Sequence, residues 1–311
     1  MHASVVTRFD TAPTWAEFPE PTPTPDEVLV EVVAAGLHPR VRSQASGSHY
    51  TSEGALPLVP GVDGVGRFPD GTLRYFAVQS DTRGSMAERV AVDPRASVVL
   101  PDGADPVSIA AGVNPVMSSW VALRRRIDFP DGARVLVLGA TGASGRAAVQ
   151  VAKHLGASHV VASGRNADRL AALPAIGADV VVPLDDVDGL ATAASDVDVV
   201  IDYVWGAPAA AAMAAIVTAR RERGIRLDWI AIGSTAGPEA PIPSAALRAS
   251  GLTIVGSGQG SVGTGAFVAE LPGIVAAITD GTIAVDAAAV PMRDVEAAWS
   301  AAGDGRTALV R

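Results

Sequence analysis

The chain has 311 residues, of which 24 are Lys or Arg and 33 are Asp or Glu, so its formal net charge is −9. This acidic balance argues against a general nucleic-acid-binding protein, because such proteins normally present a basic face. Apolar residues make up 49% of the sequence and no cysteine is present. A disordered chain, disulfide bonds, a thiolate nucleophile and cysteine-ligated metal sites are therefore excluded.

The N-terminus reads MHASVVTRFDTAPTW and lacks the basic region followed by an apolar core that marks a secretory signal. Apolar runs such as residues 207–215 are well below the roughly 20 residues that a membrane-spanning helix needs. We therefore expect a cytoplasmic protein with no membrane partner.

The first third of the chain is rich in strand and loop patterns. Segments 27-EVLVEVVAAG-36 and 84-GSMAERVAVDP-94 have strand composition, with prolines before the first and at the end of the second. Segment 56-LPLVPGVDGVGRF-68 mixes short apolar runs with Gly and Pro, which is typical of tight turns and bulges. Together these patterns predict a partly open β-barrel or sandwich.

From about Pro106 the pattern changes to alternating helices and strands. Segment 106–126 has helical spacing, which we expect to break at Asn114-Pro115. Six short apolar runs then alternate with helical stretches: 134-RVLVL-138, 159-HVVAS-163, 179-DVVVP-183, 197-VDVVID-202, 228-DWIAIG-233 and 252-LTIVG-256. This alternation predicts a doubly wound parallel sheet of the α/β class. We expect two later runs, 282–292 and 307–311, to return strands to the first domain.

Three glycines at three-residue spacing, Gly139, Gly142 and Gly145, separate the first of these strands from a helix. In a parallel sheet this first β–α turn is where the pyrophosphate of a dinucleotide binds. One glycine permits the tight turn, another lets the backbone approach the phosphates, and a third lets helix and strand pack closely. The helix N-terminus adds N–H donors and a partial positive charge. The predicted pyrophosphate-binding residues are Gly139, Thr141, Gly142, Ala143, Ser144 and Gly145.

The end of the second strand distinguishes NADPH from NADH. A site for NADH usually places Asp or Glu there to bind the ribose hydroxyls, but segment 160-VVASGRNADRL-170 has no acid where one is needed. It offers Ser163, Arg165 and Asn166, whose donors suit a 2′-phosphate through charge-assisted hydrogen bonds. We therefore predict that the cofactor is NADPH.

The chain resembles the medium-chain dehydrogenase/reductase superfamily, and within it the zinc-free quinone oxidoreductase and enoyl reductase branch. The resemblance runs nearly from end to end, through 27-EVLVEVVAAGLHP-39, 57-PLVPGVDGVG-66, 84-GSMAERVAV-92, 135-VLVLGATGASGRAAVQVAKHLGA-157, 177-GAD-179, 200-VIDYVWG-206 and 303-GDGRTALV-310. It implies a GroES-like β-barrel catalytic domain, residues 1–112 and 259–311, and a Rossmann NADPH-binding domain, residues 113–258, with the nicotinamide in a cleft between them. It also implies a small-molecule substrate and a homodimer that pairs through 252-LTIVGSG-258.

The chain departs from its relatives at two places. The zinc alcohol dehydrogenases of the superfamily have a Cys after Ala-Ala-Gly and a His-Glu pair after Pro-Gly, where this chain has His38 and Val62-Asp63. Two ligands do not make a zinc site, so we expect no metal. Quinone reductase relatives usually have Asn-Pro-x-Asp where this chain has 38-HPRV-41. Two roles for His38 stay open, a proton donor or a replacement for the hydrogen bond of that asparagine.

The resemblance also implies which residues lie beside the nicotinamide and the substrate. Tyr50 lies in the loop where relatives place a substrate-side tyrosine, so Tyr50 and His38 are the candidate catalytic residues. Ser118 matches a hydroxyl position that faces the nicotinamide; alternatively, it caps a helix that restarts after Pro115. Backbone contacts with the nicotinamide end are expected from the ends of the fifth and sixth strands, at Gly233, Ser234, Gly256 and Ser257.

These features predict a zinc-independent, NADPH-dependent reductase that transfers hydride to a quinone or to the alkene of an α,β-unsaturated carbonyl compound. Two alternatives stay open. One is the reduction of a specialised biosynthetic ketone, imine or enoyl intermediate. The other is an NADPH-binding sensor without turnover, which the changed segment 38-HPRV-41 keeps in consideration.

Overall fold

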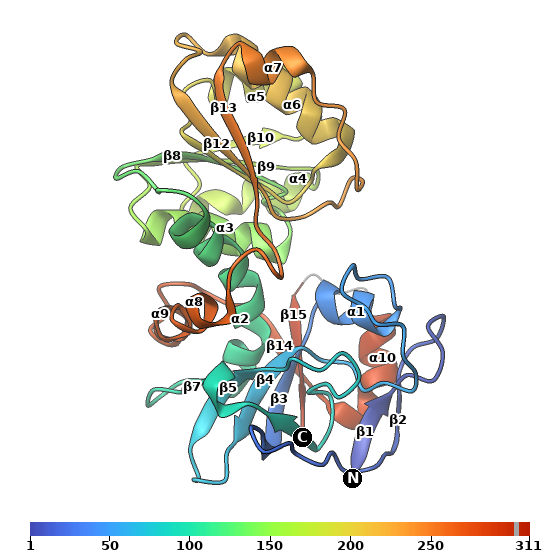
Figure 1. The fold of residues 1–311 in the computed structure, drawn as a ribbon. Helices are drawn as coiled ribbons and strands as arrows, with labels where there is room; N and C mark the ends of the chain where they lie inside the picture. Colours follow the sequence, from blue (N-terminus) through green and yellow to red (C-terminus); the bar gives the residue numbers. More distant parts are fainter. Residues whose placement is uncertain (302–304) are drawn as a thin grey trace. The chain divides into compact units, whose positions relative to one another are not determined.

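The computed structural model describes residues 1–301 and 305–311, which form two compact units (Figure 1). The first unit combines Met1–Asn114 with Val268–Arg311, and the second spans Pro115–Phe267. From the sequence, the domain boundaries are expected at 112/113 and 258/259. In the structure a helix runs across each boundary between the units. The amino-acid composition therefore does not change at the boundary. Residues 303 and 304, which open the resembling segment 303–310, lie outside the described residues.

A seven-stranded sheet organises the first unit. Its strands follow the order β14-β15-β3-β4-β5-β7, and β6 also pairs with β3. Strand β15 is antiparallel to β3, with Leu309 opposite Ala35, so strands from both ends of the chain share one sheet. The strands are β3 (Val28–Leu37), β4 (Asp63–Arg67), β5 (Leu73–Ala77), β6 (Arg89–Val92), β7 (Ser97–Val99), β14 (Ala287–Pro291) and β15 (Arg306–Val310). A separate two-stranded sheet joins β1 (His2–Val5) to β2 (Thr14–Glu17).

The core of the first unit joins this sheet to short helices from both ends of the chain. Val30 and Leu309 from the sheet share one buried cluster with Val41 of α1 (Pro39–Ala45) and Val295 of α10 (Val295–Ser300). The remaining elements of the unit are the longer helix α9 (Leu271–Thr279) and the 3-10 turns η1 (Pro94–Ala96) and η4 (Met292–Asp294). Because the cluster holds both β3 and α1, it fixes the residues that connect them.

Helix α2 (Pro106–Val121) continues through Pro115, so the expected break at Asn114-Pro115 is wrong. A proline inside a helix removes one backbone donor and costs about 3 kcal/mol. Val113 and Val116 on either side of it are fully buried, and this packing offsets the cost. A wider helical turn, Ala122–Arg126, extends the helix.

The stretch Pro106–Arg126 is also the one helix of the described residues that is long and apolar enough to cross a membrane. Length and composition alone decide that test, and core helices of globular proteins pass it as well. Here 67% of the apolar 18-residue segment of this helix is buried inside the protein. This is the packing of a core helix.

Six parallel strands form the sheet of the second unit, in the order β10-β9-β8-β11-β12-β13. They are β8 (Arg134–Leu138), β9 (His159–Gly164), β10 (Val180–Pro183), β11 (Val199–Asp202), β12 (Arg226–Ala231) and β13 (Gly251–Gly256). All six strands expected from the sequence are confirmed, to within two residues at each end. The strand order reverses between β8 and β11, and sheets of this kind bind ligands beside that reversal, at the carboxyl ends of the strands.

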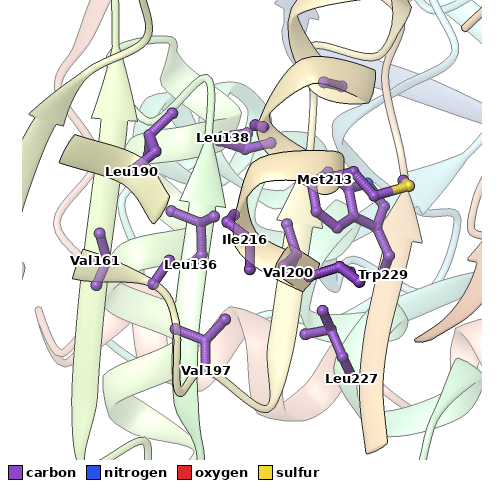
Figure 2. Close-up of a cluster of buried hydrophobic side chains, with 14 of the residues drawn as sticks. Leu136, Leu138, Val161, Leu190, Val197, Val200, Met213, Ile216, Leu227 and Trp229 are labelled. Atoms are coloured by element: carbon purple, nitrogen blue, oxygen red, sulfur yellow. The ribbon is translucent and has the colours of Figure 1, made fainter. Parts of the chain in front are cut away.

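Helices cover the sheet of the second unit: α3 (Ala143–His154), α4 (Ala167–Ala171), α5 (Val187–Ala193), α6 (Gly206–Ala219) and α7 (Ser244–Arg248), with the 3-10 turn η3 (Leu173–Ile176) after α4 and the short α8 (Thr264–Val268) at the unit boundary. Figure 2 shows Met213 and Ile216 of α6 packed with Leu136, Val200 and Trp229 of the sheet. Strands covered in this way are continuous apolar runs, as the sequence shows. Packing in this core fixes the positions of β8 and β11, and so fixes where the loops that follow them begin.

Candidate functional site

The glycine turn connects the carboxyl end of β8 to α3. Gly139 has a φ of +84°, a conformation that glycine adopts at no steric cost. The N–H groups of Gly139 and Ala140 donate to the carbonyl oxygen of Ser163, at 2.9 and 2.8 Å. The turn is therefore tied to the end of the neighbouring strand β9.

Gly142 and Gly145 have opposite surroundings. A Cβ atom at Gly145 would meet the carbonyl oxygen of Gly139 and would come within 2.6 Å of the Cα atom of Ala140, so α3 can lie against the turn only with glycine there. A Cβ atom at Gly142 would meet nothing in the described chain closer than the Gly139 carbonyl oxygen, at 3.5 Å. The three glycines thus fit the three roles of a pyrophosphate-binding turn: a special conformation, an open approach and a close contact.

The remaining turn residues surround the N-terminus of α3. Gly142 is the N-cap and is exposed, and Thr141, Ala143 and Ser144 are partly exposed beside it. The first N–H groups of any helix lack an acceptor within the helix, and α3 has 12 residues to align its peptide dipoles. A pyrophosphate group fits this position in charge and in access.

The three residues expected at the 2′-phosphate have different environments. Ser163 is fully buried, and its Oγ has no hydrogen-bond partner among the described residues. Arg165 is exposed directly after β9. Asn166 caps α4, because its Oδ1 accepts from a backbone N–H three residues later, at 2.9 Å. Gly164 packs against Thr141 of the glycine turn. Arg165 is the next residue along the chain, so it places an exposed cation close to that turn.

The carboxyl end of β11 holds a buried acid, Asp202. Its Oδ1 accepts from the backbone N–H groups of Val204 and Trp205, at 2.7 and 2.9 Å, and its Oδ2 accepts from Trp229 Nε1 at 2.9 Å. Burial raises the pKa of the Asp202 carboxyl, and these hydrogen bonds oppose the increase. Trp205 is held at φ 51° and ψ −163°, a conformation nearly restricted to glycine. The strand end is therefore fixed in one backbone conformation by its own side chain.

Ser118 and Tyr203 meet beside this strand end. The Ser118 hydroxyl donates to the carbonyl oxygen of Pro115 at 2.7 Å and lies 2.7 Å from the Tyr203 hydroxyl. Because α2 is continuous, the alternative role of Ser118, the cap of a restarted helix, is wrong. On the other side of Tyr203 lies Gly233, where a Cβ atom would come within 2.8 Å of the Tyr203 carbonyl oxygen.

The loops after β12 and β13 reach the same edge of the sheet. The N–H of Gly233 donates to the carbonyl oxygen of Asp202 at 3.1 Å, and Ser234 follows it in an exposed position. Gly256 ends β13 in an exposed position, and Ser257 after it is buried. All four expected residues thus lie at carboxyl ends of strands, and their contact with a nicotinamide stays a prediction.

One arginine of the basic run 124–126 fastens the last of these loops. Arg126 Nε donates to the carbonyl oxygen of Gly256 at 2.8 Å, and a second nitrogen of its guanidinium donates to the carbonyl oxygen of Ser261 at 3.0 Å. These bonds join the end of the long helix to the loop after β13. Arg126 therefore fixes the position of this loop.

In the first unit a buried polar network follows β3. His38 Nε2 lies 3.1 Å from Asp63 Oδ1, and both residues are 2% exposed. The Tyr75 hydroxyl donates to Asp63 Oδ2 at 2.9 Å. Burial, with the nearby Asp63, raises the pKa of Tyr75 well above its usual value, so Tyr75 remains a donor at physiological pH. We call His38, Asp63 and Tyr75 the His–Asp–Tyr network.

The network leaves one nitrogen of His38 for another partner. With both oxygens of Asp63 accepting, a neutral imidazole carries its hydrogen on Nε2. The Nδ1 atom is buried and has no hydrogen-bond partner among the described residues. Buried polar atoms are rarely left unsatisfied, so Nδ1 is a place where a ligand group would be bound. The described part of the chain contains no group of three or more His, Cys, Asp or Glu residues that could hold a metal ion.

Tyr50 lies in a second, more exposed group. It is 72% exposed, and its ring packs against the His49 ring at a tilt of 31°, with centroids 4.2 Å apart. The Thr51 hydroxyl lies 2.8 Å from His49 Nδ1 and accepts from Arg40 at 3.2 Å. Arg40 also faces Asp81 at 3.9 Å. Tyr50 is therefore positioned by its neighbours in the loop rather than by burial.

His49 gives this loop a pH dependence. Burial, with a smaller contribution from Arg40, lowers the pKa of His49 from 6.5 to about 4. Between those values the unfolded chain binds a proton that the folded protein does not, so stability is present above pH 6.5 and is lost as the pH falls toward 4. We expect the urea midpoint to fall across this range, and to fall less for His49→Gln. Identical pH profiles for the two proteins would contradict this assignment.

Sequence reasoning missed four residues of these sites: Asp202, Tyr203, Tyr75 and Arg126. Asp202 ends a strand that the sequence located and Tyr203 follows it, and the rule that selected Gly233 would also have selected them. Tyr75 gave no local signal, because only the pairing of β4 with β5 brings it to Asp63.

Comparison with known proteins identifies the family. "Probable NADPH-dependent quinone reductase tdiC" of Emericella nidulans is 34% identical to this chain, over 96% of this chain and 96% of its own length. The chain belongs to the medium-chain dehydrogenase/reductase superfamily. Within the superfamily it belongs to the quinone oxidoreductase and enoyl reductase branch, as its sequence motifs indicate.

Other members of the superfamily agree with this placement. The quinone oxidoreductase of Thermus thermophilus, solved alone and in complex with NADPH, is 29% identical with a TM-score of 0.83 over 100% of both chains. This confirms the expected fold class, a Rossmann sheet with a β-rich GroES-like domain. The NADPH-dependent alkenal/one oxidoreductase, chloroplastic, of Arabidopsis thaliana is 28% identical over 50% of this chain and 45% of its own. The zinc-binding dehydrogenase family model matches residues 143–278, a range that does not include His38 or Asp63.

Proposed function

We propose that this protein is an NADPH-dependent reductase that transfers hydride to a quinone or to the alkene of an α,β-unsaturated carbonyl compound. The observation that carries the proposal is the glycine turn at the reversal of the parallel sheet, crowded at Gly145 and open at Gly142. The reaction class is supported by relatives that are named as a quinone reductase, a quinone oxidoreductase and an alkenal/one oxidoreductase.

Arg165 supports NADPH as the cofactor in preference to NADH. Its exposed guanidinium follows β9 directly, and the strand end 163-SGRN-166 contains no acid. A guanidinium binds phosphate through charge-assisted hydrogen bonds, with Ser163 and Asn166 as the proposed neighbouring contacts. The cofactor supplies the hydride from its nicotinamide, and the protein supplies orientation and the exclusion of water.

His38 and Tyr50 are the proposed residues on the acceptor side. When hydride reaches the β-carbon of a conjugated carbonyl compound, charge develops on the carbonyl oxygen and a proton must reach the α-carbon. With His38 Nε2 bonded to Asp63, a protonated ring carries its other hydrogen on Nδ1, from which a proton can be delivered. The hydroxyl of Tyr50 is the second proposed donor. This chemistry needs no metal, and we propose that the reaction is independent of zinc.

A specialised acceptor is the second candidate, and Arg40 favours it. Segment 38-HPRV-41 places the cation of Arg40 next to His38, where the Asn-Pro-x-Asp motif of the branch specifies no charge. The Arg40 side chain is only 16% exposed and lies in the same loop group as Tyr50. A half-enclosed guanidinium suits a biosynthetic ketone, imine or enoyl compound that carries an acidic group.

We further propose that the protein is a cytoplasmic homodimer without nucleic-acid or membrane partners. Among the described strands, β13 pairs with β12 alone, so its other edge offers backbone donors and acceptors to a second copy. The net charge of −9 disfavours nucleic acid. A monomeric mass in light scattering at micromolar concentration would contradict the dimer.

The test of the proposed function is NADPH oxidation in the presence of an ortho-quinone or a simple enone, followed by the absorbance of the reduced nicotinamide. We expect turnover with at least one of the two acceptors. No turnover with either, together with tight NADPH binding, would reject this reaction and leave the specialised acceptor or the sensor without turnover. Failure to bind NADPH would reject the proposed reductase, the reductase of a specialised acceptor and the sensor without turnover.

A further inference from the structure

Two groups of Thr51 fix the imidazole of His49 in one tautomer. The backbone N–H of Thr51 donates to His49 Nδ1 at 3.2 Å. A backbone N–H can only donate, so Nδ1 has a lone pair and no hydrogen. The Thr51 hydroxyl lies 2.8 Å from the same Nδ1, and it must therefore also donate to it. The neutral ring of His49 then has its hydrogen on Nε2.

The surroundings of His49 keep its ring neutral at physiological pH. Burial lowers the pKa of His49 to about 4, and the charge of Arg40 adds to this effect while that of Asp81 opposes it. The Arg40 guanidinium also donates to the Thr51 hydroxyl at 3.2 Å. Hydrogen bonds therefore run in one direction, from Arg40 to Thr51 and from Thr51 to His49.

The Nε2–H of His49 is the donor that this arrangement leaves for a ligand. Both hydrogen bonds between the His49 ring and the described residues are made by Nδ1. His49 is partly exposed, and Nε2 is not one of the buried unpartnered atoms of the described chain, so its N–H is open to solvent. The ring packs against Tyr50, and the backbone N–H of Glu53 ties the loop to Asp81 Oδ2 at 2.8 Å. The Nε2–H is therefore a fixed donor beside Tyr50.

A hydrogen-bond donor is needed where the acceptor develops charge. Acceptance of hydride by a quinone or a conjugated carbonyl compound moves electrons onto a carbonyl oxygen. A neutral imidazole can stabilise such an oxygen while it keeps its own proton. We infer that His49 Nε2–H donates a hydrogen bond to the carbonyl oxygen of the acceptor, and that Thr51 is the positioning residue that sets the tautomer of His49. Because His49 keeps its proton, the proton for the α-carbon comes from another group. The inference rests on the proposed function, which puts the acceptor beside Tyr50.

Kinetics of His49 variants with the acceptor that the wild-type protein reduces test the inference. His49→Phe keeps an aromatic ring against Tyr50 and removes the donor. We expect its kcat/KM to fall about 10- to 100-fold, near the lower end of what one oxyanion donor contributes, while its affinity for NADPH in calorimetry stays unchanged. His49→Gln, whose amide N–H reaches about as far as Nε2–H, should recover most of the loss. Ser48→Ala is the matched control, because Ser48 is the exposed neighbour of His49 and its hydroxyl lies 2.8 Å from that of Ser46.

Two variants of Thr51 test its positioning role. Thr51→Val keeps the shape of the side chain without its hydroxyl, and we expect kcat/KM to fall about 3- to 10-fold, which corresponds to one neutral hydrogen bond. Thr51→Ser keeps the hydroxyl and should retain the wild-type value. Equal losses in the two variants would contradict the positioning role.

Nitrogen-15 NMR of the imidazole rings adds a readout that a merely structural role would not move. The signals of His49 are those that disappear in His49→Gln, and we expect them to show the hydrogen on Nε2. With NADP⁺ in place of NADPH no hydride is available, and addition of the ortho-quinone should shift the Nε2 signal. A hydrogen on Nδ1, or a His49→Phe variant as active as Ser48→Ala, would overturn the inference and leave the proposed function in place. If the wild-type protein reduces neither the quinone nor the enone, the proposed function fails and this inference with it.

Discussion

Gly145→Ala is expected to abolish NADPH binding and to destabilise the second unit by roughly 1–3 kcal/mol, the usual cost of an overpacked position. The added methyl group would overlap the backbone of Gly139 and Ala140, and no side-chain rotation can relieve a clash between a Cβ atom and a backbone. Either α3 moves away from the turn or the turn itself opens, and both displace the N–H groups that would bind the pyrophosphate. Urea unfolding and NADPH titration measure the two effects.

Gly142→Ala is the matched control for that experiment. Gly142 has a φ of −78°, which any residue adopts, and its position is open. We expect the stability to change by less than about 0.5 kcal/mol, while NADPH affinity decreases because the methyl group occupies the approach to the phosphates. If Gly145→Ala keeps both wild-type stability and wild-type affinity, the close contact between α3 and the turn is not required.

Asp63→Ala is expected to destabilise the protein by roughly 2–5 kcal/mol. It leaves the Tyr75 hydroxyl and the His38 Nε2 atom without their shared acceptor, inside a region where His38 and Tyr75 are at most 2% exposed. Buried donors without acceptors cost far more than an exposed ion pair contributes. The free energy of unfolding from urea titration, with the m-value checked for constancy, measures the loss.

Two variants separate the parts of the His–Asp–Tyr network. Tyr75→Phe removes one donor and leaves the bond between His38 and Asp63, so we expect a smaller loss of about 1 kcal/mol. Asp63→Asn keeps the shape of the side chain and should fall between the other two variants. A loss below about 1 kcal/mol for Asp63→Ala would show that water reaches the network, and the unpartnered Nδ1 of His38 would then lose its significance.

The sheet of the second unit could be predicted from the sequence because its strands are local, continuous apolar runs. Strands β8 and β9 begin at Arg134 and His159, where the sequence places them, since burial on both faces needs no information about partners. The glycine turn was equally predictable, because spacing along the chain sets its conformation and its contacts. The continuity of α2 was not predictable, since the buried neighbours of Pro115 that offset its cost are a tertiary effect.

The polar networks depend on pairing between distant segments, and for that reason the sequence shows them poorly. Tyr75 meets Asp63 because Asp63 is opposite Ala77 in the pairing of β4 with β5, which makes Tyr75 its diagonal neighbour on the same face. Ser118 and Tyr203 are 85 positions apart. The sequence located Ser118 only through family resemblance, and it gave no indication that its hydroxyl lies beside that of Tyr203.

The protein is an NADPH-dependent reductase, and we propose that Arg165 gives it its preference for NADPH. The most direct test is the ratio of kcat/KM for NADPH to that for NADH, measured with the same acceptor in the wild-type protein and in Arg165→Gln. We expect the wild-type protein to prefer NADPH by about 10- to 100-fold, the value of a charge-assisted hydrogen bond. Arg165→Gln should lose most of that preference, with kcat/KM for NADH unchanged. Equal use of NADH by the wild-type protein, or a preference for NADPH that survives in Arg165→Gln, would contradict this role of Arg165.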